Sequence, residues 1–320
     1  MISSSIANEP DTISKRILVL GAGELGLAII SALRAHSSSP EVSVLLRPDS
    51  SSAGSIPDNI HIVFGDLSDP VEALADTLRP FEIVISASGF AGGPGSQLHI
   101  ARAALHAGIE WYFPWQFGVD YDVIGRGSSQ PLFDEQLSVR ELLRAQDKVK
   151  WTIVSTGLFT SFLFEPAFGV VNLDSDSDSK TGGRRATVTA LGDWKNRVTV
   201  TPAQDIGRLV AHIALDPRSP ANADEVDEKT GVLHIASDTL TFERLAELLE
   251  KRGWEVTREL ASVADLQAKL EAEPDDVGLR YQLVWARNRG VAWEVESSWN
   301  GRRGIPMENL ETWLASSSLL

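Results

Sequence analysis

A glycine turn between an apolar run and an apolar-periodic run is the part of this sequence best suited to chemistry. Residues 16–20 predict a strand, Gly21-Ala22-Gly23-Glu24-Leu25-Gly26 follows, and residues 27–30 begin a predicted helix. In such a turn the first glycine makes the tight bend, the second lets backbone approach a pyrophosphate, and the third allows helix and strand to pack closely. The turn predicts a dinucleotide site, with candidate contacts at Gly21, Gly23, Glu24, Leu25 and Gly26.

The residue after the second predicted strand bears on which nucleotide is bound. Residues 42–46 lead into Arg47, where an NAD-specific site usually has an acid that holds the ribose hydroxyls. A guanidinium at this place can pair bidentately with a 2′-phosphate, so the sequence favours NADP(H). NAD(H) is the alternative, because Asp49 is an acid two residues further on, and Arg47 could also be an ordinary solvated side chain.

Two later strand ends supply further candidate contacts. Asp66 follows a strand predicted over 60–64 and could either meet the adenine end of the cofactor or cap the next helix. Residues 82–86 predict a buried fourth strand that opens into small residues, including Ser88 and Gly89. Open parallel sheets bind ligands at the carboxyl ends of their strands, so Ser88 and Gly89 are candidate cofactor contacts, with a surface loop as the alternative.

The order of the apolar segments indicates an α/β fold built on a right-handed, doubly wound parallel sheet. Strands predicted over residues 110–114 and 151–154 alternate with helices predicted over 96–107 and 130–145. Repeated βα units with short links are typical of such a sheet.

We expect three segments of different character along the chain. Residues 1–15 would be a polar tail, and 16–156 would form an NADP-binding Rossmann domain with contributions from about 198–215 and 231–237. The remainder of 157–320 would form mainly a smaller α+β substrate lobe. Within it the sequence predicts a core segment or cleft wall over 158–164, a polar loop over 174–180 and a link over 216–229. It also predicts helices over 241–252 and 262–271.

Composition limits the class of protein further. The absence of cysteine excludes disulfides and thiolate nucleophiles and fits a reducing compartment, so we expect a cytoplasmic protein. No apolar stretch approaches about 18 residues, and the polar start does not resemble a signal peptide, so we expect no membrane segment. A net charge of −15 argues against nucleic acid as a partner. A small molecule is the expected partner, and a homodimer stays open.

The tyrosine and lysine pair that many reductases use for proton transfer is absent. In that pair the lysine lies four residues after the tyrosine and lowers the pKa of its phenol. The corresponding residues after the three tyrosines, Tyr112, Tyr121 and Tyr281, are Gln116, Gly125 and Trp285. No lysine occurs between Lys15 and Lys148, so the cofactor half offers none as an acid.

With these residues in view, the sequence resembles the NmrA-like family, and within it the isoflavone reductase and phenylcoumaran benzylic ether reductase branch. The resemblance rests on the glycine turn, on Arg47, on Gln97 opening a helix, and above all on Trp111-Tyr112-Phe113-Pro114-Trp115-Gln116-Phe117-Gly118-Val119-Asp120. It implies an atypical short-chain reductase fold with NADP(H) along the strand ends. It also implies a small C-terminal lobe that closes over an aromatic or polyketide-like substrate.

Two departures from that family concern the candidate catalytic residues. The plant reductases carry a lysine early in the helix after the motif, and the resemblance places Gln136 there. An amide cannot give up a proton at neutral pH, although Gln136 could hydrogen-bond a substrate oxygen or the nicotinamide ribose. Proton transfer would then fall to water, Asp120 or Tyr121. The family's serine is replaced by Trp115, which would narrow the pocket.

These features favour an NADP(H)-dependent oxidoreductase acting on a small, aromatic or polyketide-like secondary metabolite. The reacting carbon would lie over the Ser88-Gly89 loop and the loop that carries Trp115 and Phe117, which adds both aromatic residues to the candidate cofactor contacts. Two other classes stay open. One is a sensor that distinguishes NADP from NADPH without turnover, and the other is a cofactor-assisted cyclisation or rearrangement with no net redox change.

Overall fold

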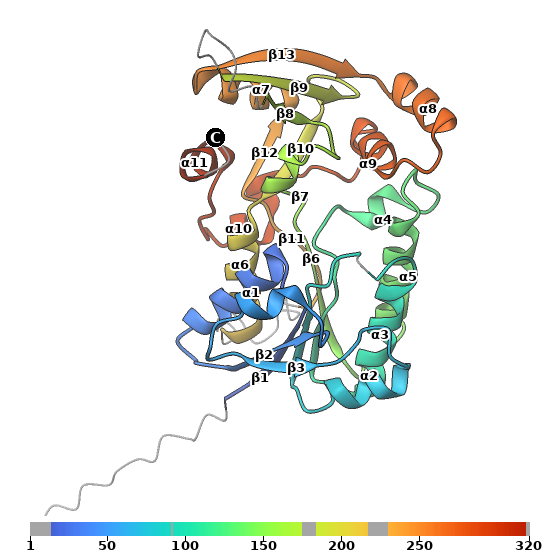
Figure 1. Ribbon diagram of the computed structural model, residues 1–320, viewed down its shortest axis with the longest axis vertical. Helices are drawn as coiled ribbons and strands as arrows, with labels where there is room; N and C mark the ends of the chain where they lie inside the picture. Colours follow the sequence, from blue (N-terminus) through green and yellow to red (C-terminus); the bar gives the residue numbers. More distant parts are fainter. Residues whose placement is uncertain (1–13, 91, 175–183, 217–229, 318–320) are drawn as a thin grey trace, which may run out of the picture.

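A seven-stranded parallel sheet forms the lower half of the molecule in Figure 1. The computed structural model describes residues 14–90, 92–174, 184–216 and 230–317. Each pair of neighbouring strands is parallel. In sheet order the strands are β11 (Gly231–His234), β6 (Lys150–Ser155), β5 (Trp111–Phe113), β4 (Ile83–Ser86), β1 (Arg16–Leu20), β2 (Glu41–Leu46) and β3 (His61–Phe64).

Helices cover both faces of this sheet. Figure 1 shows α1 (Glu24–Ala35) and α6 (Ala203–Leu215) on one side and α2 (Val71–Leu78), α3 (Ser96–Ala107) and α5 (Leu132–Arg144) on the other. Alternate residues of β1 therefore enter two different cores: Ile17 and Val19 pack towards α1, and Leu18 and Leu20 pack towards α3. Burial on both faces explains why the strands are apolar throughout rather than alternating. The predicted doubly wound α/β fold is confirmed.

The strand order places the point where the chain reverses direction between β1 and β4. From β1 the chain winds outward through β2 and β3, and then returns to β4 on the other side of β1. In open parallel sheets the loops at such a reversal leave a crevice at the carboxyl ends of the strands. The glycine turn follows β1 and the Ser88-Gly89 loop follows β4, so both predicted cofactor segments lie at this crevice.

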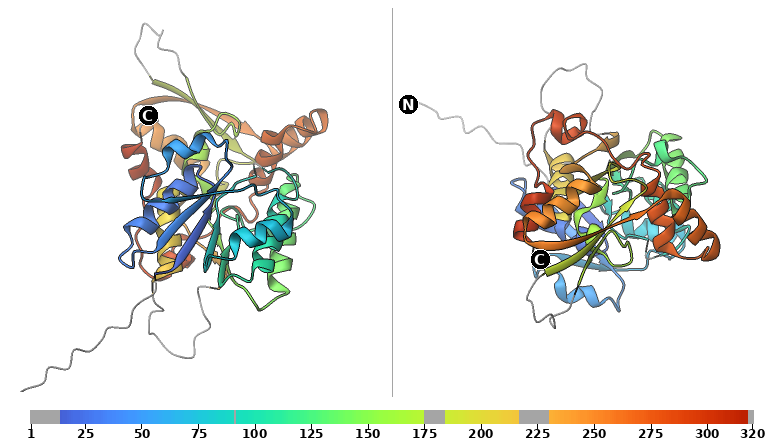
Figure 2. Two further views of the ribbon diagram at one scale, coloured as in Figure 1. Left: turned by 60° about the horizontal axis from the view of Figure 1, so that its bottom comes forward. Right: turned by 90° about the horizontal axis from the view of Figure 1, so that it is seen from above.

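Two small sheets and several helices form the upper half of the molecule. One sheet has the order β12 (Asp238–Thr241), β10 (Arg197–Thr201), β7 (Leu158–Phe159), and the other β13 (Trp254–Ala261), β9 (Arg184–Leu191), β8 (Val171–Leu173). The right-hand view in Figure 2 shows β9 and β13 crossing the top of the molecule side by side, and they pair in parallel. The helices are α7 (Phe242–Lys251), α8 (Val263–Ala272), α9 (Val277–Ala286) and α11 (Leu310–Ser316).

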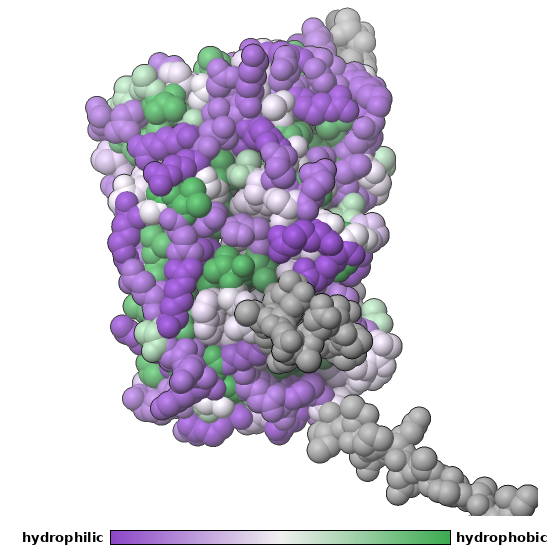
Figure 3. Space-filling model, turned by 180° about the vertical axis from the view of Figure 1, so that it is seen from behind, coloured by the Kyte–Doolittle hydropathy of each residue, from purple (hydrophilic) through white to green (hydrophobic). Residues whose placement is uncertain are grey.

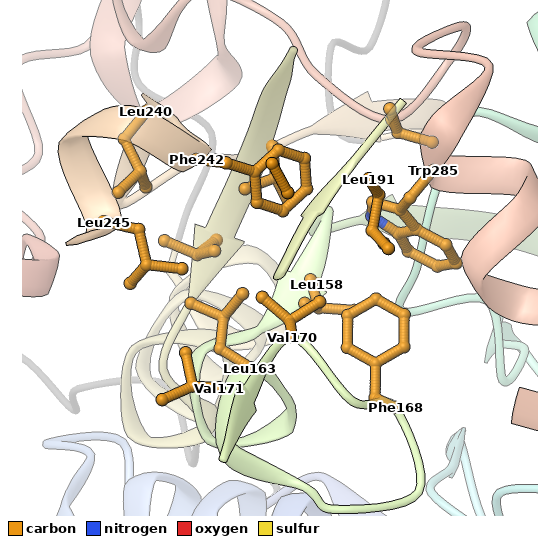
Figure 4. Close-up of a cluster of buried hydrophobic side chains, with 14 of the residues drawn as sticks. Leu158, Leu163, Phe168, Val170, Val171, Leu191, Leu240, Phe242, Leu245 and Trp285 are labelled. Carbon is orange, nitrogen blue, oxygen red and sulfur yellow. The ribbon is translucent and has the colours of Figure 1, made fainter. Parts of the chain in front are cut away.

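A separate hydrophobic core holds this upper half together. Figure 4 shows Leu158, Phe168, Phe242 and Trp285 converging from elements that lie far apart in the sequence. Phe168 is 1% exposed, and the ring of Trp285 meets it edge-on with centroids 5.4 Å apart. The helices predicted over 241–252 and 262–271 are confirmed as α7 and α8.

Short elements complete the described chain. They are α4 (Tyr121–Ile124), α10 (Trp299–Arg302), and the 3-10 helices η1 (Ser51–Ser55), η2 (Thr160–Phe164) and η3 (Val295–Ser297). Most of the predicted tail, the polar loop and the link lie outside the described residues.

The rear face in Figure 3 is mostly hydrophilic, with hydrophobic patches that are separate from one another. Exposed large hydrophobic residues in the described ranges come from different elements, among them Phe64, Val123 and Leu260. None of the described helices is both long enough and apolar enough to cross a membrane.

Candidate cofactor and substrate site

The glycine turn after β1 has a geometry that only glycine fits at two of its positions. Gly21 has φ +97°, and a Cβ added to it would lie 3.1 Å from the carbonyl oxygen of Ala87. A Cβ on Gly26 would lie 2.3 Å from the carbonyl oxygen of Gly21, which is closer than atoms can approach. The turn therefore draws α1 tightly against β1 and brings it beside the residues that follow β4.

Gly23 has a different surrounding, because apart from its chain neighbours and the α1 backbone no atom of the described residues lies within 4 Å of the place where its Cβ would be. This residue is the N-cap of α1 and has no side chain that could cap the backbone N–H groups of the first turn. A helix N-terminus with free N–H groups and open space beside it fits an anion such as a pyrophosphate.

The neighbouring helix α3 offers no such site, because the carboxylate of Glu135 occupies its N-terminus. The backbone N–H groups of Gly95 and Gln97 each donate to Glu135 at 2.7 Å, and that of Leu98 donates at 3.0 Å. The contrast between α1 and α3 supports the glycine turn as the cradle for phosphate.

The two residues between Gly23 and Gly26 differ in exposure, because Leu25 is buried and Glu24 is exposed. Leu25 is 3% exposed and belongs to the core beneath α1. The carboxylate of Glu24 accepts a hydrogen bond from the hydroxyl of Ser161 at 3.0 Å. That bond links α1 to η2 of the upper half.

Arg47 follows β2 directly, and its side chain is 66% exposed. Arg47 forms a loose ion pair with Asp49, with 3.8 Å between Nε and Oδ1. The guanidinium is therefore accessible to a phosphate, and Asp49 is the group that would compete for it.

Asp66 organises the loop after β3. Its carboxylate accepts from the backbone N–H of Ser68 at 2.8 Å and from the Ser68 hydroxyl at 2.7 Å. These hydrogen bonds hold the pKa of Asp66 below its usual value. The helix that follows has Pro70 as its N-cap and no side-chain cap, so Asp66 does not cap it.

The loop after β4 is fixed from α3. Gln97 Nε2 donates to the carbonyl oxygen of Gly89 at 2.6 Å and to the Ser88 hydroxyl at 3.4 Å. Since Glu135 caps α3, the loop, α3 and α5 are held as one unit. Phe90, the next residue of the loop, meets Trp115 edge-on with ring centroids 6.3 Å apart.

Beyond Phe90 and Trp115 lies an aromatic cavity of about 160 Å³. Trp115 forms one wall, with centroid distances of 5.8 Å to Phe117 and 6.1 Å to Phe159. The lining residues carry no formal charge; they are Phe90, Trp115, Phe117, Gly118, Val119, Tyr121, Phe133, Gly157, Leu158, Phe159, Phe162, Tyr281 and Trp285. An uncharged, flat ligand is what such a lining accommodates, because a charged group would lose its hydration without gaining a partner.

Of the three candidate catalytic residues, Tyr121 lines this cavity and the other two do not. Tyr121 is 4% exposed and its ring meets Phe133 edge-on at 5.0 Å. Burial raises the pKa of its phenol well above the ordinary value, although the guanidinium of Arg140, 5.2 Å from the ring centre, acts in the opposite direction. The hydroxyl is therefore protonated at neutral pH.

Gln136 is completely buried, and neither polar atom of its side chain has a hydrogen-bond partner among the described residues. Its backbone oxygen accepts from Gln116 Nε2 at 2.9 Å, and Gln116 in turn accepts from Arg140 Nε at 2.8 Å. Leaving buried polar groups unpaired costs about 1–3 kcal/mol each. Such an amide is satisfied either by an ordered water or by a ligand that reaches it, and Gln136 lines neither the aromatic cavity nor the polar cavity that Asp120 faces.

Asp120 lies next to Tyr121 in sequence but faces a different, polar cavity of about 270 Å³. Its carboxylate caps α4 by accepting from the N–H groups of Asp122 and Val123. Its other oxygen is 3.1 Å from Nε2 of His234. Burial would raise the pKa of Asp120, but the hydrogen bond and charge of His234 with the Val123 N–H and the charge of Arg140 outweigh it, so the pKa lies below its usual value.

Sequence reasoning missed several residues that build this site. Glu135 caps a helix that begins 39 positions earlier in the chain, and Tyr281 reaches the cavity from α9. Three tryptophans near the C-terminus have different surroundings. Trp285 lines the aromatic cavity, Trp293 lines the polar cavity, and Trp299 is 1% exposed in the core. Because the sequence has only three tyrosines, Tyr281 could have been considered as a candidate, but only the fold shows that it lies near Tyr121.

The fold and the site together define a doubly wound α/β protein whose glycine turn is built as in dinucleotide-binding folds. Residues 13–281 match the NmrA-like family, and the chain belongs to this family. It is similar to an NmrA-like family domain-containing oxidoreductase of Gibberella moniliformis, with 42% identity over 321 residues that cover 96% of this chain and 99% of that protein.

Relatives in the predicted branch are more distant. A phenylcoumaran benzylic ether reductase of Populus trichocarpa is 25% identical over 196 residues, which cover 60% of this chain and 58% of that protein. The solved binary complex of leucoanthocyanidin reductase with NADPH from Vitis vinifera aligns with a TM-score of 0.70 at 19% identity, covering 93% of this chain and 97% of that one. The resemblance predicted from the motif is confirmed.

Proposed function

We propose that this protein is an NADP(H)-dependent oxidoreductase that acts on a small, uncharged aromatic molecule. The observation that carries the proposal is the continuity between the glycine turn and the aromatic cavity. Gly21 lies against Ala87 and Ser88, the loop continues to Phe90, and Phe90 meets Trp115 at the cavity wall. A dinucleotide with its pyrophosphate at α1 and its nicotinamide towards Trp115 would reach a substrate held there.

The chain's own residues have distinct roles in this proposal. The turn of Gly21, Gly23 and Gly26, with the backbone of Glu24 and Leu25, would hold the pyrophosphate, and Arg47 the 2′-phosphate. Asp66 would lie near the adenine. Ser88, Gly89, Trp115 and Phe117 would border the nicotinamide. With Gln136 at the place where the resemblance puts the lysine of the plant reductases, NADP(H) would work without an ammonium beside it.

Bound NADPH would supply a hydride to a carbon of the substrate. Tyr121 would give its hydroxyl proton to the substrate oxygen, and a proton from water would restore the phenol. Gln136 would orient the substrate or the nicotinamide ribose with its unpaired amide. We assign Asp120 to positioning, since it holds the start of α4, and so Tyr121, from the polar cavity.

A second candidate function is an NADP sensor without turnover. It is favoured by Gln136, because an amide in place of a lysine removes the family's proton donor while leaving the nucleotide cradle intact. Unequal affinity for NADP⁺ and NADPH together with no NADPH oxidation would favour the sensor. NADPH consumption with formation of a reduced product would exclude it, and would also count against a redox-neutral rearrangement.

The uncharged lining gives a direct test of the proposed substrate class. We expect an aryl ketone to be reduced with a kcat/KM at least about a hundredfold above that of the same ketone bearing a ring carboxylate. The reason is that an unpaired carboxylate costs several kcal/mol to bury. The measurement is NADPH oxidation with product mass followed in parallel. Equal rates for the two ketones would show that reduction occurs outside this cavity.

A further inference from the structure

The aromatic cavity contains two phenol hydroxyls that no described residue engages. Tyr121 and Tyr281 both line it, and neither hydroxyl forms a hydrogen bond with another of the described residues. Besides these hydroxyls the lining offers hydrocarbon side chains, glycines and the indoles of two tryptophans. The third tyrosine, Tyr112, is fully buried in the core under α3 and does not line the cavity.

The two phenols come from different halves of the molecule and meet around one ring. Phe133 contacts Tyr121 with centroids 5.0 Å apart and Tyr281 with centroids 5.9 Å apart, both edge-on. Tyr281 also contacts Phe162 edge-on at 6.2 Å. Both tyrosines therefore lie in the same part of the cavity wall, next to Phe133.

Gly118 fixes the place of the Tyr121 hydroxyl. A Cβ on Gly118 would lie 2.7 Å from this oxygen, so the hydroxyl rests against the backbone just after Phe117. The hydroxyl thus lies next to the segment that carries Trp115 and Phe117 in the cavity wall.

We propose that Tyr121 and Tyr281 together hydrogen-bond one acceptor oxygen of the substrate, such as a carbonyl, and that Tyr281 is a specificity-determining residue for this oxygen. The inference rests on the proposed function, since the ligand concerned is the substrate of that site. Beyond that function, it names the chemical group of the substrate that is recognised and assigns one contact to a residue of the C-terminal half of the chain.

The surroundings keep both phenols in the form that donates. Burial raises the pKa of Tyr281 to about 12, and burial raises that of Tyr121 further above its ordinary value. Two protonated phenols in a cavity without charged lining residues favour a neutral acceptor oxygen. A hydrocarbon of the same shape would fill the space but leave both hydroxyls unpaired.

The test compares two probes of nearly the same shape, acetophenone and α-methylstyrene, in which a carbonyl oxygen is replaced by a methylene. Binding to the full chain is measured by ligand-observed NMR with NADP⁺ present, so no hydride can be transferred. We expect acetophenone to bind about five- to a hundredfold more tightly, from two neutral hydrogen bonds. Tyr281→Phe and Tyr121→Phe should each reduce this ratio about three- to tenfold, and Tyr112→Phe, the matched control, should leave it unchanged.

Equal affinity of the wild type for both probes would overturn the proposal, as would an unchanged ratio in Tyr281→Phe. Circular dichroism and melting temperature of the three variants establish that each one folds. NADPH oxidation is recorded separately. If the ratios respond as expected but no aromatic ketone is reduced, the oxidoreductase assignment fails while the recognition of the oxygen stands.

Discussion

Removing the guanidinium of Arg47 should lower the affinity for NADPH and leave the affinity for NADH nearly unchanged. The side chain is 66% exposed, and its Nε lies 3.8 Å from Asp49, a separation too long for a strong hydrogen bond. Little of its interaction capacity is therefore used within the chain. A charge-assisted pair with a 2′-phosphate contributes about 1.5–3 kcal/mol, so Arg47→Ala should weaken NADPH binding roughly ten- to a hundredfold. NADH lacks that phosphate, and its affinity should stay nearly constant.

Isothermal titration calorimetry of both cofactors against wild type and Arg47→Ala measures this difference. Asp49→Asn is a matched variant with the opposite expectation, because it removes the carboxylate that competes for the guanidinium. It should leave NADPH affinity unchanged or raise it a few-fold at low salt. Equal losses for NADPH and NADH in Arg47→Ala, or no loss at all, would refute the assignment of Arg47 to the 2′-phosphate.

Four further substitutions test other parts of the proposal. Gly23→Val places its side chain in open space, so the fold should survive while cofactor binding disappears in calorimetry; Gly26→Ala, which meets a carbonyl at 2.3 Å, should lower the melting temperature instead. If the unpaired amide of Gln136 contacts substrate or cofactor, Gln136→Ala should lower kcat/KM by an amount that corresponds to a loss of about 1–3 kcal/mol of transition-state stabilisation. Unchanged kinetics and unchanged NADPH affinity would show that Gln136 contacts neither ligand. Asp122 accepts hydrogen bonds from Arg144 and from the buried Arg140, and these contacts lower its pKa to about 2. The ionised carboxylate therefore stabilises the fold fully above about pH 5, and this stabilisation is lost as the pH falls from about 4 to about 2. Allowing for its partial exposure, Asp122→Asn should cost about 1–2 kcal/mol in urea unfolding at pH 7 and progressively less on acidification, and a loss that is constant with pH would contradict this.

Local patterns in the sequence sufficed for the fold of the first half. Strands buried on both faces are apolar without alternation, and the glycine turn follows the first of them, so periodicity alone located β1, α1 and the later βα units. The close packing of the glycine turn could be predicted because its requirement is local. Gly26 lies five residues after the glycine whose carbonyl it must approach.

The substrate side could be predicted only in part, because its contacts are distant in the sequence. Tyr281 joins Tyr121 through the packing of α9 against the first half, and no spacing in the sequence encodes that contact. Asp120 and Tyr121 are adjacent, yet the short helix α4 begins between them and turns them towards different cavities. The burial of Gln136 likewise depends on the loop that Gln116 holds against α5.

The central claim is that a hydride passes from NADPH to an aromatic substrate in the cavity next to Trp115. The most direct measurement uses NADPH carrying deuterium at the transferable position of the nicotinamide, with a panel of uncharged aryl ketones, enones and quinones. We expect loss of absorbance at the reduced nicotinamide band and one deuterium on carbon in the product, and both should be strongly reduced in Tyr121→Phe. NADPH that binds tightly but is not consumed with any of these compounds, or a product without deuterium, would contradict it.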